Sequence, residues 1–100
     1  LTTRRPLLSY VPQGIHPRVF NKMIGDLRER GLWAERHSYS MRVMYQGRFV
    51  ASLHFYPGYN LVEVRVYAES RELNEAIARE IGGVIARYLP GYKLEVKFLR

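Results

Sequence analysis

The segment from Arg48 to Tyr67 constrains the fold most, because it holds two alternating runs joined by a turn sequence. Runs 48–56 and 61–67 place an apolar residue at every other position, with Pro-Gly-Tyr-Asn between them. This period is typical of β-strands with one buried face, and Pro and Gly favour a turn. The segment therefore predicts an antiparallel hairpin. Its core positions are expected to be Phe49, Ala51, Leu53, Phe55, Val62, Val64 and Val66.

The opposite face of this hairpin has an unusual composition for a surface in contact with water. It carries rings, an arginine and aliphatic side chains, where a solvated strand face is usually rich in small polar and charged residues. These positions are Val50, Ser52, His54, Tyr56, Leu61, Glu63, Arg65 and Tyr67. Such a face indicates a surface that binds something.

The remaining chain predicts two helices and two further strands. Pro17 is expected in the first turn of a helix that ends at Gly31, and Ser70 is expected to cap a helix over 71–89. Strands are expected near 36–46 and over 92–99. The predicted fold is α+β with the order α-β-β-β-α-β. It is a four-stranded, mostly antiparallel sheet with both helices on one face and the other face open.

The domain organisation is simple. Residues 1–14 have no period and hold two prolines, so they predict an extended N-terminal arm, and 15–100 predict one domain. No apolar run approaches the ~20 residues of a spanning helix, and nothing resembles a signal peptide. The chain has no Cys, which is compatible with a reducing cytoplasm and excludes thiolate metal sites.

Turn lengths predict which residues share a row across the sheet, since a slip of one residue exchanges the faces. A three-residue loop over 46–48 sets Val43 opposite Ala51, and a four-residue loop over 57–60 sets Phe55 opposite Val62. On the open face this places Arg42, Ser52 and Arg65 in one row. It places Met44, Val50 and Tyr67 in the next row. Trp33 is expected in the core.

The charge indicates a polyanionic partner. Sixteen Lys and Arg against nine Asp and Glu give +7, and all but three of the basic residues are arginines. Arginine suits phosphate forks and stacking on flat rings. The excess is concentrated in the first half: 1–48 carries nine basic and three acidic residues, whereas 49–100 carries seven and six. An arginine-rich thermophilic surface is the alternative explanation.

Catalysis and metal binding are not expected. The histidines at 16, 37 and 54 fall on separate elements without metal-ligand spacing, and no nucleophile elbow or phosphate loop is present. His54 beside Glu63 is the one candidate acid–base pair, and a structural hydrogen bond or ion pair explains it as well. We therefore expect a binding protein without cofactor or metal.

Single-stranded nucleic acid fits the composition of the open face. Bases stack on exposed rings while Arg and Lys follow the phosphates. We expect the stacking rings to be Tyr56, Tyr59 and Tyr67, with His54 beside them in the binding surface. We expect the phosphate contacts to be Arg36, Arg42, Arg48, Arg65 and Lys97.

The architecture and the basic, aromatic sheet resemble the DNA-binding domain of ThermoDBP, a family of single-stranded DNA-binding proteins of thermophilic archaea. The resemblance covers about Pro17 to Leu99 and rests on element order and composition. It implies sequence-tolerant capture of single-stranded DNA in a basic and apolar cleft beside or between subunits. We expect a homodimer, through the sheet or the helix that contains Gly82 and Gly83, and separately a cytoplasmic location. The family's C-terminal coiled coil has no counterpart among these residues.

Two alternatives stay open on the sequence. The same surface would suit a single-stranded RNA module, since a single polar contact to the 2′-OH separates RNA from DNA. It would also suit a non-catalytic interaction domain that buries the apolar face against a second copy.

Overall fold

The computed structural model describes residues 14–99. Its elements are α2 (Pro17–Glu29), β1 (Trp33–His37), β2 (Ser40–Tyr45), β3 (Arg48–Tyr56), the 3-10 helix η1 (Pro57–Tyr59), β4 (Leu61–Val66), α3 (Arg71–Tyr88) and β5 (Lys93–Phe98). The arm expected over 1–14 lies outside the described residues, apart from Gly14.

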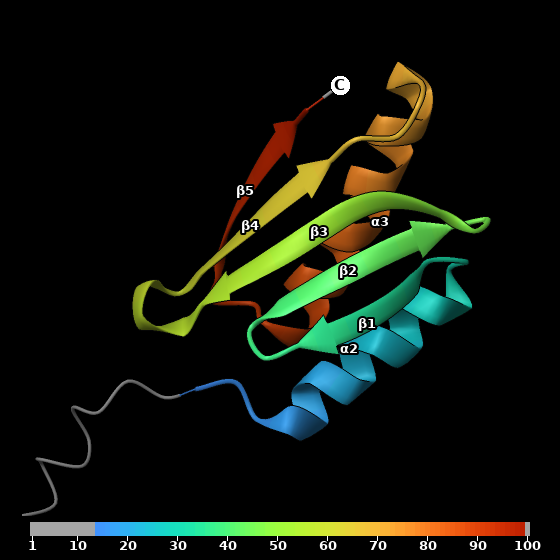
Figure 1. Cartoon of the computed structure of the whole chain (residues 1–100). Helices are drawn as coiled ribbons and strands as arrows, with labels where there is room; N and C mark the ends of the chain where they lie inside the picture. Colours follow the sequence, from blue (N-terminus) through green and yellow to red (C-terminus); the bar gives the residue numbers. More distant parts are fainter. Residues whose placement is uncertain (1–13, 100) are drawn as a thin grey trace, which may run out of the picture.

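The strands form one mixed sheet in the order β1-β2-β3-β4-β5. The pairs β1–β2, β2–β3 and β3–β4 are antiparallel. β5 runs parallel to β4 after the crossover through α3. Both helices lie on the same side of the sheet (Figure 1). The α+β class and the single helix layer are confirmed. Within the described residues the sheet has five strands and not four.

Both helices begin at the predicted residues because a side chain caps each one. His16 Nδ1 accepts a hydrogen bond from Arg18 N at 3.0 Å, and Pro17 occupies the first turn. Ser70 Oγ accepts from Leu73 N at 3.1 Å. Gly31, at φ 86°, follows the C-cap residue Arg30 of α2 in a conformation that glycine adopts readily.

The core lies between the helix layer and one face of the sheet. From α2 it contains Phe20, Met23 and Leu27, all at most 1% exposed. The two mid-helix glycines of α3 allow close contact. A Cβ on Gly82 would lie 3.4 Å from Leu94 of β5, and one on Gly83 would lie 3.1 Å from Arg30, which follows α2.

The strand expected near 36–46 is in fact a hairpin, which explains the fifth strand. Ser38 takes a positive φ of 57°, and His37 pairs with Ser40 across this tight turn. The reversal places Arg36 opposite the buried Met41. Arg36 therefore lies on the helix side, with its guanidinium 4.8 Å from the ring of Phe20. Its expected position on the open face was wrong.

The β2–β3 turn also differs from the prediction. It is a two-residue loop of Gln46 and Gly47, both with positive φ, so Tyr45 pairs with Arg48. A β-bulge then shifts the register: Met44 pairs with Phe49, while Val43 still pairs with Ala51. On β3 the residues from Ala51 onward face as predicted. The two residues nearer the β2–β3 turn are exchanged, so Val50 is buried at 4% exposure and Phe49 is 46% exposed.

The β3–β4 hairpin follows the predicted register. Phe55 pairs with Val62, and Ser52 stands between Arg42 and Arg65. The row of two arginines is therefore confirmed. The predicted row of Met44, Val50 and Tyr67 was wrong at Val50, because Phe49 pairs with Met44 and occupies that position.

Candidate nucleic-acid interface

The open face is the side of the sheet away from α2 and α3. Its central row runs across all five strands, and its members are Glu35, Arg42, Ser52, Arg65 and Lys97. Because side chains alternate along each strand, every second residue of β2, β3 and β4 contributes to this face. Charged groups on four of the five strands, with Ser52 of β3 between them, are thus placed in register by the sheet.

A hollow of 620 Å³ occupies the middle of the open face. It brings together four of the predicted binding residues: Arg42, His54, Arg65 and Tyr67. The full lining is Glu35, His37, Ser40, Met41, Arg42, Phe49, Ser52, His54, Arg65 and Tyr67. The hollow thus combines two arginines with two aromatic rings.

The two rings of the hollow form a pair. Phe49 and Tyr67 have centroids 4.9 Å apart with their planes tilted by 55°. The Arg42 guanidinium carbon lies 5.5 Å from the centroid of Phe49. Apolar ring surface and a positive charge are therefore adjacent, the combination that stacks a base and holds its phosphate.

Glu63 compensates two of the cations on this face. Its carboxylate is bound by Arg65 Nη2 at 3.0 Å and by Lys97 Nζ at 2.9 Å, although only 8% of the residue is exposed. The hydrogen bond from Lys97, with the charge of Arg65, lowers the pKa of Glu63 below its ordinary value. Arg42, in contrast, forms no salt bridge with any described residue.

His54 pairs with Glu63 across the strands, as predicted. Its hydrogen bond, however, joins Nε2 to Ser52 Oγ at 3.2 Å on its own strand. The half-buried ring thus lines the hollow beside Arg42 and Arg65. This geometry suits a polar contact to a ligand.

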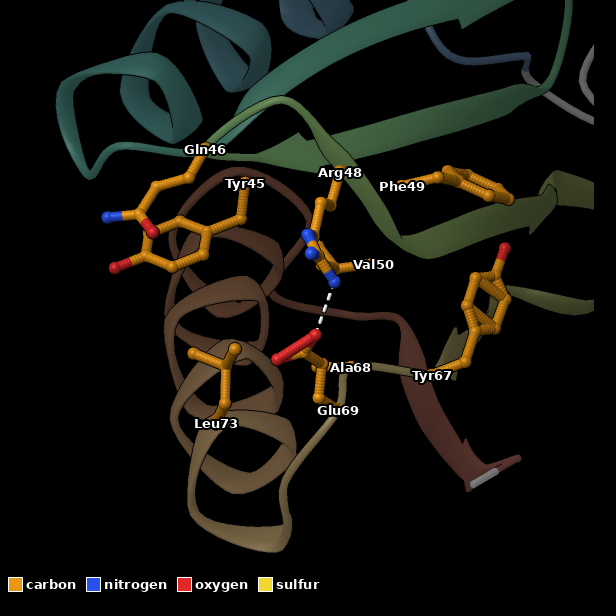
Figure 2. Close-up of a pocket in the computed structure, with 9 residues that line it drawn as sticks. All are labelled: Tyr45, Gln46, Arg48, Phe49, Val50, Tyr67, Ala68, Glu69 and Leu73. Atoms are coloured by element: carbon orange, nitrogen blue, oxygen red, sulfur yellow. Dashed lines mark hydrogen bonds and ion pairs between the residues drawn. The ribbon is translucent and has the colours of Figure 1, made fainter.

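Five predicted residues lie outside the hollow, and Arg36 and Lys97 are two of them. Tyr56 and the 81% exposed Tyr59 stand at the β3–β4 turn. Arg48 forms an ion pair with Glu69 at a second hollow, of 580 Å³. Figure 2 shows this ion pair between the Phe49 and Tyr67 rings on one side and Leu73 of α3 on the other. The two hollows share the ring pair.

Two aromatic residues of the open face were missed. Phe49 was assigned to the core because a three-residue loop was expected, whereas Gln46 and Gly47, both with positive φ, form a two-residue turn. Trp33 was also expected in the core, but it is 51% exposed at the sheet edge. Its Nε1 donates to Glu35 at 3.3 Å, and the guanidinium of Arg28 stacks on it at 3.7 Å.

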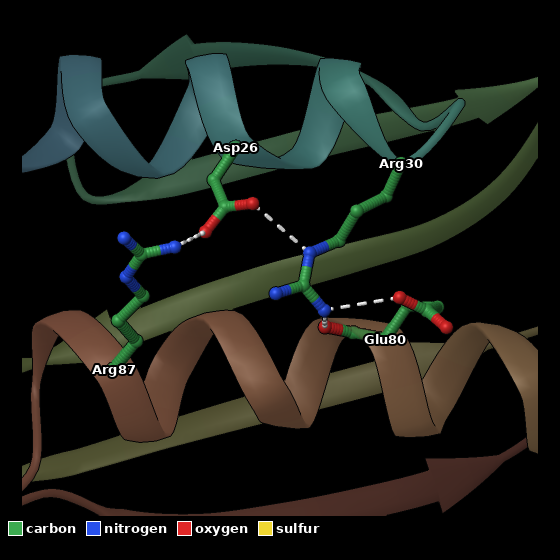
Figure 3. Close-up of polar contacts among 4 residues, drawn as sticks. All are labelled: Asp26, Arg30, Glu80 and Arg87. Atoms are coloured by element: carbon green, nitrogen blue, oxygen red, sulfur yellow. Dashed lines mark hydrogen bonds and ion pairs between the residues drawn. The ribbon is translucent and has the colours of Figure 1, made fainter.

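The charges between the helices are mutually compensated, as are Arg65 and Lys97 of the open face but not Arg42. Asp26 binds Arg30 at 3.0 Å and Arg87 at 3.2 Å, while Arg30 also reaches Glu80 at 3.0 Å (Figure 3). This network joins α2 to α3. The hydrogen bond from Arg30 lowers the pKa of Asp26.

This network predicts a pH-dependent contribution to stability. Because the folded-state pKa of Asp26 is lowered, its stabilisation is complete above the ordinary carboxyl pKa and is lost as the pH falls through the lowered value. Asp26→Asn should therefore lower the free energy of unfolding most at neutral pH, with a difference that shrinks below about pH 4. Urea unfolding across this range measures it. A difference that did not change with pH would contradict the assignment.

Among residues 14–99 no group of three or more His, Asp or Glu side chains could hold a metal ion. No helix in this part of the chain is both long and apolar enough to cross a membrane. Comparison of the chain with protein-family models, with curated proteins and with solved structures finds no significant match.

Proposed function

We propose that the open face binds single-stranded nucleic acid, DNA before RNA, without sequence specificity and without chemistry. The observation that carries the proposal is the Phe49–Tyr67 ring pair beside Arg42, on a face that neither described helix covers. Every base has a flat face that can stack, and every nucleotide carries a phosphate. A surface of this kind accepts any sequence.

A single strand suits this surface better than a duplex. The rings lie in a hollow in which unpaired bases can stack, whereas paired bases are held inside their helix. On α3, Arg71 forms an ion pair with Glu75, so the helix does not present the continuous basic face that would suit a duplex groove. The preference for DNA rests on the resemblance to the ThermoDBP family, which stays a prediction, as do the cytoplasmic location and the homodimer.

A competition experiment tests the proposal. A labelled single strand of mixed sequence is bound at low salt, and unlabelled single strands and a duplex of equal length compete for the protein. Other single strands should compete within a few-fold of each other, pyrimidine runs included, and the duplex should compete poorly. Equal competition by the duplex would rule out stacking as the basis of binding. RNA of the same sequence, added as a further competitor, measures the DNA preference.

The salt bridges of Glu63 predict that a variant at this position binds single-stranded DNA more tightly than the unmodified protein. Glu63→Gln removes the negative charge shared by Arg65 and Lys97, so these cations become available to phosphates. Affinity should rise, and the slope of log K against log[salt] should become steeper by about 0.7 for each added phosphate contact. Anisotropy titrations at several salt concentrations measure both, with circular dichroism as the folding control. Unchanged affinity and slope would place the phosphates away from this pair.

A further inference from the structure

The outer edge of β5 has no partner strand in the part of the chain that the structure describes. Lys93 N and Leu99 N donate to the carbonyls of Asn60 and Val66 at 2.7 and 2.8 Å, so they face β4. Because backbone groups alternate along a strand, the N–H and C=O groups of Leu94, Val96 and Phe98 point away from β4. Within residues 14–99 no strand pairs with this edge.

The opposite edge of the sheet is better protected. β1 is five residues long, Arg28 Nη2 donates to the carbonyl of Ala34 at 3.2 Å, and the same guanidinium covers Trp33. Short strands and charged side chains are devices that prevent edge pairing. β5, of six residues, also carries charged side chains, but no arginine contact of this kind covers it among the described residues. Instead, Leu94 and Phe98 are 37% and 51% exposed on its helix side.

We propose that β5 pairs antiparallel with β5 of a second copy of this chain, with Val96 on the two-fold axis. In this register the outward backbone groups of Val96 meet their own counterparts, and those of Leu94 meet those of Phe98. On the helix side, Leu94 and Phe98 then cover each other. On the open face, Glu95 lies opposite Lys97 of the second copy, twice by symmetry.

Neighbouring registers fit less well. With the axis at Glu95, glutamate opposes glutamate and Lys93 opposes Lys97, so every charged pair is repulsive. With the axis at Leu94, Lys93 opposes Glu95 favourably, but Phe98 extends beyond the paired region. Only the Val96 register combines opposite charges with cover for both exposed apolar side chains.

The helix side leaves room for the second copy. Phe98 borders a hollow of 550 Å³ together with the start of α3, including Ser70 and Asn74. The second copy's Leu94, placed opposite Phe98, would lie beside this hollow. Pairing would also join two five-stranded sheets into one and make their open faces continuous. The proposal stands on β5 alone and does not depend on nucleic-acid binding.

Charge reversal tests the pairing in the absence of nucleic acid. Sedimentation velocity over a concentration series should show a dimer for the unmodified chain. Glu95→Lys and Lys97→Glu should each raise the dimer dissociation constant about tenfold or more, because both symmetric pairs become repulsive. Mixing the two variants should restore the dimer, since lysines on one chain then oppose glutamates on the other. Glu29→Lys, at an exposed position on α2 away from β5, is the matched control and should leave the dimer intact.

Cysteine cross-linking tests the register, and the absence of native Cys makes it unambiguous. Val96→Cys on the axis should give a disulfide-linked dimer under mild oxidation, since directly opposite residues lie about 5.5 Å apart. Leu94→Cys should not cross-link, because Leu94 lies opposite Phe98 and the two cysteines would therefore be four residues apart along the paired strands. A chain that stays monomeric throughout the series overturns the proposal. So does a Leu94→Cys protein that cross-links more readily than Val96→Cys.

Discussion

Tyr67→Ala is expected to weaken single-stranded DNA binding by about 1–3 kcal/mol while leaving the salt dependence unchanged. The ring lies 4.9 Å from Phe49 in the hollow of the open face, and its removal takes away stacking surface but no charge. Anisotropy titrations of the variant and the unmodified protein, at three or more salt concentrations, measure affinity and slope separately.

Tyr59→Ala provides the matched comparison. This tyrosine is 81% exposed, but it lies at the β3–β4 turn outside the hollow, so its loss should cost less affinity. Sizing of both variants separates binding from self-association through this face. A Tyr67→Ala protein that loses its oligomeric state and still binds DNA at full strength would show that the open face is an interaction surface between copies.

Arg42→Ala is expected to weaken binding to every sequence alike and to make the salt slope shallower by about 0.7. At ~0.1 M salt this corresponds to roughly a fivefold loss. The effect should exceed that of Arg65→Ala, because Arg65 forms a salt bridge with Glu63, whereas Arg42 forms none with a described residue, although Glu35 lies opposite it on β1.

Arg79→Ala is the control for net charge. Arg79 is exposed on α3, in the layer opposite the open face, and its loss changes the total charge by the same amount. If both variants reduced binding equally, the overall charge of the protein would be responsible, and the specific position of Arg42 would not matter.

The β3–β4 hairpin could be predicted from sequence because three independent signals agree there. Alternation is strict on both strands, the turn holds Pro and Gly, and the apolar faces match only in the observed register. Arg42, Ser52 and Arg65 were placed correctly for this reason. His54 and Tyr67 followed from the same register.

The β2–β3 turn could not be predicted fully, because the bulge shifts the register by one residue and the loop length alone therefore does not determine the strand pairing. A two-residue loop alone would expose both Phe49 and Phe55. The extra residue at the bulge restores the register for Phe55 and leaves only Phe49 outside. Periodicity detects a strand but not one inserted residue. The aromatic partner of Tyr67 was therefore missed.

The β1–β2 hairpin was missed because its turn lacks the residues that usually mark one. Ser38 adopts a positive φ without being Gly, Asn or Asp, the residues that favour this conformation. Treating 36–46 as one strand put Arg36 on the wrong face. The ion pair of Arg48 with Glu69 could not be predicted either, since it depends on where α3 begins.

The most direct test of the central claim is an NMR titration of the ¹⁵N-labelled protein with a short single-stranded oligonucleotide at low salt. The account predicts that the largest shifts fall on the open face, at the amides around Arg42, Phe49 and Ser52 and at the Arg42 side-chain Nε–H, while α2 and α3 change little. Shifts confined to the helix layer, or no shifts at a large excess of oligonucleotide, would contradict it.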